Sequence, residues 1–266
     1  MRLLNASCLL PSAVCLVVVA GCAAKAPSLP TGRGAPFPDY LAAYHQATSA
    51  CRGVTTMTAS MAMSGKAGTT KLRGRIDAGF EAPQRVRLEG RAPFGKPVFI
   101  LVADAGRGTL VLPRDERLLR DAPPDQIVEA LAGVRLGPEA LRTAIAGCGF
   151  SVAAPSGGSS FPNGWISIAV DEATAYLRRH SGNWEMAAAA SGPLTVTYAD
   201  YSAGRPMTVR LRAQSQGRTS ADLTLRLSDV DINTTLNPKT FEVEIPEHPV
   251  PLTLEELRRA GPLGGS

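Results

Sequence analysis

The chain has 266 residues, of which 44% are hydrophobic and 19% are charged, a composition typical of a globular protein and not of a disordered or fibrous one. Lys and Arg number 28 against 23 Asp and Glu, which gives a net charge of +5. Most of the arginines alternate with apolar residues instead of clustering, so the charge pattern argues against nucleic acid as a partner. Only one stretch, near the N-terminus, is apolar enough to meet a membrane, which excludes a polytopic membrane protein.

The N-terminus has the pattern of a signal peptide. After the basic start Met1-Arg2, an apolar run from Cys8 to Ala20 has the length of a signal-peptide core. The run ends in Val19-Ala20-Gly21-Cys22, which resembles the lipobox of bacterial lipoproteins. This resemblance implies removal of residues 1–21 and a covalent lipid on Cys22, with no other cofactor. Ala23 occupies the position after the cysteine, where inner-membrane lipoproteins of enteric bacteria usually carry Asp. Its presence there favours a location in the outer membrane. An ordinary secretory signal containing a cysteine is the alternative.

Two cysteines, Cys51 and Cys148, remain in the exported part of the chain. Because the space outside the inner membrane is oxidising, a disulfide between them is the natural expectation. Their separation in sequence does not show that the side chains meet, so two small buried hydrophobic residues are the alternative.

Residues 22–36 are rich in Pro, Gly, Ala and Ser without periodicity, which predicts a flexible tether between the anchor and a domain over residues 37–246. A helix is expected from Phe37, because Phe37, Leu41, Tyr44 and Thr48 share one helical face. Beyond this domain, residues 247–266 form a tail with a short helix over 253–259.

Strands dominate the rest of the domain, since apolar and polar residues alternate with a period of two. The pattern predicts about eleven strands of an antiparallel sheet, at residues 71–80, 85–91, 97–102, 109–112, 165–170, 175–179, 184–188, 194–198, 207–212, 223–227 and 241–245.

Two short helices interrupt the strands, at 123–133 and 138–147, each opened by proline and stopped by glycine. A Gly/Ser/Pro-rich segment over 155–164 predicts a mobile loop.

The expected fold is therefore mainly β (α+β): an open, curved antiparallel sheet or half-barrel whose concave face is covered by short helices. Because the helices are short for the area that they must cover, we expect an incompletely filled apolar interior. The residues expected to line it are Leu72, Ile76, Phe80, Val86, Leu88, Phe99, Leu131, Leu141, Ile145, Val209 and Leu211.

Several segments, in order, resemble the LolB family of outer-membrane lipoprotein receptors over roughly residues 37–233. They are Arg91-Ala92-Pro93-Phe94-Gly95, Leu110-Val111-Leu112, Ala130 to Val134, Leu141 to Gly147, Gly182 to Glu185, Tyr198 to Tyr201, Pro206-Met207 and Asp229-Val230-Asp231. The segment 155–164 and the stretch from Thr234 onward exceed the family's usual length, which leaves open whether this chain is a receptor or a relative with another lipid-like cargo.

The resemblance implies a LolA/LolB-like half-barrel with a helical lid, anchored to the periplasmic face of the outer membrane. Its cavity would hold the acyl chains of lipoproteins, received from a LolA-like periplasmic carrier and delivered to outer-membrane lipid. The loop Pro93, Phe94 and Gly95 would project Phe94 into the membrane. A buried Phe94 that anchors the loop on the barrel rim is the alternative. A carrier of another lipid and a non-catalytic envelope scaffold are the alternative functions.

An enzyme needs a constellation of reactive groups, and the sequence offers none that we recognise. His45, His180 and His248 lack metal-ligand spacing, so no metal site is expected. Asp229, Asp231 and Asn233 imitate the start of a calcium loop, whose later Gly and Glu positions hold threonines.

Overall fold

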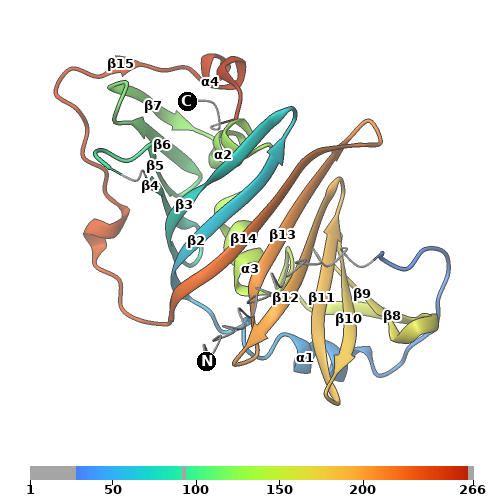
Figure 1. The fold of residues 1–266 in the computed structure, drawn as a ribbon. Coiled ribbons are helices and arrows are strands. Elements are labelled where there is room, and N and C mark those ends of the chain that lie inside the picture. Colours follow the sequence, from blue (N-terminus) through green and yellow to red (C-terminus); the bar gives the residue numbers. More distant parts are fainter. Residues whose placement is uncertain (1–27, 92–93, 263–266) are drawn as a thin grey trace, which may run out of the picture.

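The computed structural model describes residues 28–91 and 94–262, and its strands form one 15-stranded sheet (Figure 1). In space their order is β1-β8-β9-β10-β11-β12-β13-β14-β2-β3-β4-β5-β6-β7-β15, and neighbours are antiparallel except the pair β7 and β15. Their bounds are β1 Ala35–Pro36, β2 Thr56–Ala67, β3 Thr70–Glu81, β4 Arg85–Arg91, β5 Phe99–Asp104, β6 Arg107–Leu112, β7 Arg117–Ala122, β8 Pro155–Ser160, β9 Ile166–Val170, β10 Ala173–His180, β11 Asn183–Ser191, β12 Leu194–Ser202, β13 Arg205–Ser215, β14 Arg218–Ile232 and β15 Val250–Pro251.

The sheet curls around two short helices, α2 (Pro124–Ala132) and α3 (Pro138–Ala146), as Figure 1 shows. Both predicted helices are confirmed, and local chemistry explains their ends. Each helix has proline at its first position, where no backbone N–H is needed, and ends at a left-handed glycine, Gly133 or Gly147. The open, curved and mostly antiparallel sheet is likewise confirmed.

Glycine also lets α2 approach the sheet closely. A side chain at Gly108 on β6 would place its Cβ 2.8 Å from the Cδ1 atom of Ile127 on α2, which real Cβ contacts do not allow. The absence of a side chain at Gly108 therefore permits the fully buried Ile127 to sit directly on the strand.

The first helix, α1 (Tyr40–Ala47), packs against β8, β10 and β11. Tyr44 of α1 is buried, and the ring of Phe37 meets the Trp184 ring edge-on at 5.9 Å between centroids. The helix begins three residues later than the sequence predicted, because Phe37 donates its backbone N–H to the Gly158 carbonyl and extends the edge of the sheet.

The C-terminal tail is fastened to the body. After β14, the chain forms a short 3-10 helix, η2 (Pro238–Phe241), that packs against β4 and β5. It then reaches β7 through β15 and ends in α4 (Leu254–Ala260), which packs against α2 and confirms the predicted tail helix.

The count of about eleven strands was too low. Ten of the predicted strands are present, and five more were not predicted: β1, β2, β7, β8 and β15. Segment 155–164, predicted as a mobile loop, forms β8 and a 3-10 turn at Pro162–Gly164 because β9 supplies hydrogen-bond partners to its Gly/Ser backbone. Composition alone does not reveal such pairing.

The predicted strand over 241–245 was wrong. Phe241 ends the 3-10 helix η2 and is buried under the Arg85 guanidinium, 4.4 Å from the ring centroid, whereas the residues after it follow the surface without a ladder. Val243 is half-buried and Ile245 is exposed, so alternation in this sequence reflects neither strand pairing nor a buried face.

Candidate functional site

The eleven residues expected to line the interior come together in one apolar cluster. Leu72, Ile76 and Phe80 lie on β3, and the register with β4 puts Val86 opposite Phe80 on the same face. The others lie on β4 (Leu88), β5 (Phe99), β13 (Val209, Leu211), α2 (Leu131) and α3 (Leu141, Ile145).

All eleven are buried, and the two helices fill the space in front of them. Ile145 borders a space of about 180 Å³ beside the end of α3. Outside this small space, an acyl chain could reach the concave face only by displacing α2 or α3, because close-packed side chains leave no room for it.

A broader hollow of about 880 Å³ opens beside the starts of α2 and α3. The lining is mixed, and among its described members it includes the carboxylates of Asp125, Glu139, Asp171 and Glu172. Arg135 neutralises one of them through an ion pair of 2.8 Å with Asp125. The hollow thus combines carboxylates with apolar residues and differs in chemistry from the apolar concave face.

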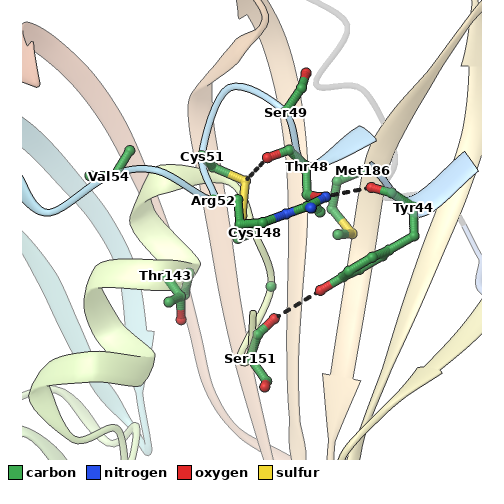
Figure 2. The surroundings of a disulfide bond; sticks show 12 residues. Tyr44, Thr48, Ser49, Cys51, Arg52, Val54, Thr143, Cys148, Ser151 and Met186 are labelled. Carbon is green, nitrogen blue, oxygen red and sulfur yellow. Dashed lines mark hydrogen bonds between the residues drawn. A yellow bond between two sulfur atoms is a disulfide. The ribbon is translucent and has the colours of Figure 1, made fainter. Parts of the chain in front are cut away.

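The far end of α3 is held by a disulfide between Cys51 and Cys148, whose Cα atoms are 5.7 Å apart (Figure 2). Cys51 lies in the turn after α1, and Cys148 follows α3 directly. The expected cross-link is therefore present in the structure. Tyr44 beside it donates its hydroxyl hydrogen to the Ser151 carbonyl at 3.3 Å, as Figure 2 also shows.

Two polar side chains that the sequence analysis missed fasten the same helix. Arg142 of α3 donates to the Val54 carbonyl just before β2. Tyr198 of β12 donates to the Ala144 carbonyl at 2.9 Å and accepts from the Gly149 N–H at 3.0 Å. A sequence signal existed for Arg142, since it lies three residues before Ile145 and so shares its buried helix face.

Burial changes the acidity of both groups. Loss of water around Tyr198 strongly raises the pKa of its phenol, because the phenolate form is poorly stabilised in the core. The same desolvation lowers the pKa of the Arg142 guanidinium. Both groups serve as hydrogen-bond donors that orient α3.

The concave face also contains methionines that the sequence analysis did not select. Met57, Met61 and Met63 alternate along β2, and Met57 and Met61 are buried in the core cluster. Their period-two spacing was a usable signal, weakened by the intervening Ala, Ser and Thr. Methionine is unbranched and polarisable, so this part of the surface adapts to different apolar shapes more readily than leucine or valine does.

Phe94 lies in the loop between β4 and β5 and is 90% exposed, the most exposed large apolar side chain among the described residues. Gly95 behind it has a φ of +78°, and nothing lies within 4 Å of where its Cβ would be. The loop therefore turns sharply in open space and presents the ring to solvent. A Phe94 buried on the barrel rim is not what the structure shows.

Two predicted sites lie outside the described residues: Cys22 with the whole signal segment 1–21, and Pro93 of the loop. Among residues 28–91 and 94–262, His, Cys, Asp and Glu side chains form no group suited to hold a metal ion. No helix in this same part of the chain is long and apolar enough to cross a membrane.

Comparison with known proteins finds similarity in structure alone. No protein-family model matches the sequence, and no curated protein matches it. A LolA superfamily protein from Nitrosomonas europaea superposes with a TM-score of 0.52 at 12% identity, covering 76% of this chain and 96% of the other. A DUF1329 family protein from Desulfovibrio piger gives 0.48 at 10% identity, with coverage of 76% and 96%. A putative outer membrane lipoprotein-sorting protein domain from Vibrio parahaemolyticus gives 0.46 at 12%, with coverage of 76% and 95%.

The first of these likenesses extends over nearly the whole related chain and over most of this one. At 12% identity it establishes architecture, and architecture alone does not carry function. The chain therefore has a LolA-like fold.

Proposed function

We propose that this protein is a lipid-anchored lipoprotein of the outer membrane, facing the periplasm, that binds acyl chains in its half-barrel and accepts or inserts lipoproteins there. Residues 1–21 serve as the signal peptide, Cys22 carries the lipid, residues 22–36 form the tether, and residues 37–246 form the binding domain. A LolA-like carrier supplies the cargo, as in the LolB family that the sequence resembles.

The exposed ring of Phe94 is the observation that carries this proposal. A large apolar side chain on a tight, open turn is costly to keep in water and gains about 1.5–3 kcal/mol when fully buried in an apolar phase. A tethered protein keeps its domain close to lipid, so the membrane surface is the apolar phase within reach. The LolA-like fold and the lipobox pattern support the same conclusion independently.

Cargo binding requires movement of the helices, because the concave face is filled in the closed arrangement. The N-terminal ends of α2 and α3 border the open hollow, whereas the C-terminal end of α3 is tied by the disulfide. Opening therefore starts at the hollow, with α2 moving away first while the disulfide at Cys148 holds the far end of α3. The adaptable methionines of β2 then face the entering chain.

The filled interior favours a second candidate, a non-catalytic envelope scaffold. Mass spectrometry of lipid that co-purifies with the full chain carrying Cys22→Ser separates the two functions. Bound acyl lipid or lipopeptide supports a carrier, and the identity of that lipid distinguishes lipoprotein cargo from another lipid. Protein that is empty after mild purification supports the scaffold.

Membrane insertion is tested with Phe94→Glu, since a carboxylate resists entry into hydrocarbon. We expect Phe94→Glu to lose most binding to liposomes of outer-membrane lipid while its melting temperature stays unchanged. Leu41→Glu is the matched control, because it places the same carboxylate on another exposed apolar position, 49% exposed on α1. Equal liposome binding by the two variants would remove Phe94 from the proposal.

A further inference from the structure

A small apolar cavity of about 180 Å³ lies between the end of α3 and the strands β2, β12, β13 and β14. Most of its described lining is apolar and includes two thioethers; the members are Met57, Ile145, Ala146, Ser202, Ala203, Arg205, Pro206, Met207, Leu227 and Val230. For scale, an engineered cavity of about 150 Å³ in another protein holds benzene. The space suits one short apolar chain, and a diacyl lipid would not fit.

Arg205 is the one charged residue in this described lining. It is half-buried at the first position of β13, and its Nε–H is shielded from water without a hydrogen-bond partner. Its guanidinium forms no ion pair within 4 Å with any residue that the structure describes, because every such pair there involves another arginine.

Two other arginines, the half-buried Arg210 and the buried Arg142, have protein partners that Arg205 lacks. Arg210, also on β13, donates from Nε and a terminal nitrogen to both oxygens of Asp222, at 2.6 and 2.7 Å. Arg142 also has an unpaired Nε, but a terminal nitrogen donates to the Val54 carbonyl. The terminal nitrogens of Arg205 thus have no protein partner among the described residues, and their two parallel N–H groups match the two oxygens of a carboxylate.

From this juxtaposition we infer that the cavity is a binding site for a medium-chain fatty carboxylate, with the carboxylate on Arg205 and the chain among Met57, Met207 and Leu227. One guanidinium balances one negative charge, so a carboxylate suits the site better than a phosphate monoester, which carries more than one charge at neutral pH. The ligand is a free amphiphile and not the lipoprotein cargo. Binding of this ligand can be confirmed or refuted independently of membrane insertion by Phe94.

The test uses the full chain held in amphipol and titrated with hexanoate, hexanol and hexyl phosphate by calorimetry. We expect saturable hexanoate binding, at least tenfold tighter than that of hexanol and tighter than that of hexyl phosphate. Arg205→Gln should weaken hexanoate binding by about tenfold or more and change hexanol binding by less than about threefold. Arg226→Gln, which removes an exposed arginine from β14, should leave both unchanged.

A spectroscopic measurement keeps the test decisive if Arg205→Gln fails to fold. The Nε–H resonance of Arg205 in the unsubstituted protein should shift as hexanoate saturates the site, and Val230→Trp, which fills the cavity, should abolish that shift. Undetectable hexanoate binding, equal affinity for hexanol, tighter binding of hexyl phosphate, or an unmoved Nε–H resonance would each overturn the assignment.

Discussion

Helices α2 and α3 each have nine residues and cover the same concave face, yet the chain fastens them by different means. The C-terminal end of α3 is held by a disulfide and by directional hydrogen bonds from Arg142 and Tyr198. In contrast, α2 is held from outside by α4, through buried Leu257 and a hydrogen bond of 2.6 Å from Arg258 to Gln126. A covalent tie survives local opening and apolar docking does not, so α2 with α4 is the part that separates first.

The largest effect is expected from removing the disulfide. Replacing both Cys51 and Cys148 with serine should lower the free energy of unfolding by about 2–5 kcal/mol, because the bond closes a loop of 97 residues and restricts the unfolded chain. Urea denaturation measures the change, and reductant added to the unsubstituted protein should reproduce it. In hydrogen exchange, protection of the backbone amides should fall in α3 and not in α2. Equal loss of protection in both helices would contradict the proposed difference in how they are held.

Leu257→Ala should have the next largest effect, a loss of about 2–4 kcal/mol, since it leaves a cavity between α4 and α2. Exchange should now increase in α2 and α4 while α3 stays protected. Arg259→Ala is the matched control on the same helix, because Arg259 is exposed and pairs only with Glu255. That control should change stability by less than about 0.5 kcal/mol.

Tyr198→Phe tests the polar contacts that hold α3 and should cost about 1–2 kcal/mol near neutral pH. It removes the donor to the Ala144 carbonyl, which still accepts from the Gly147 N–H, and the acceptor for the Gly149 N–H. Because the pKa of Tyr198 is raised in the folded state, its contribution is complete below the unfolded pKa of about 10 and is lost as pH rises above it.

The stability of the unsubstituted protein should therefore fall between pH 10 and 11 more steeply than that of Tyr198→Phe. From pH 7 to 9 the difference between the two proteins should be constant. Parallel stability curves through pH 11 would show that Tyr198 ionises as easily in the folded chain as in the unfolded one.

The smallest effect is expected from the cap of α4. Thr253 accepts from the Glu256 N–H at 3.2 Å, and the Glu256 carboxylate accepts from the Thr253 N–H at 2.8 Å. Thr253→Ala should cost about 1 kcal/mol, whereas Thr253→Ser should retain the stability of the unsubstituted protein. If both variants behave alike, the capping hydroxyl contributes nothing to holding α4, and thus nothing to holding α2.

Some residues of the candidate site could be predicted from the sequence and others could not. The eleven apolar positions were identifiable from period-two alternation, from helical spacing and, for Phe99, from a uniformly apolar run, and the structure brings them together in one core. Sequence analysis selected neither Arg142 nor Tyr198, because their importance comes from the Val54 and Ala144 carbonyls that they meet. The volume left empty in the interior could not be predicted from the sequence either. Whether two short helices fill the concave face of a curved sheet depends on the combined shapes of side chains from many strands.

Local patterns in the sequence determined the helices with a proline start and a glycine stop, the period-two strands and the expectation of an exported, lipid-anchored chain. These features depend on residues within a few positions of one another. Only the tertiary structure decided that the Gly/Ser segment of β8 is a strand, that 241–245 is not, and that Cys51 meets Cys148. The reason is that backbone pairing and side-chain contact depend on partners distant in sequence, whose positions are set by the curvature of the whole sheet.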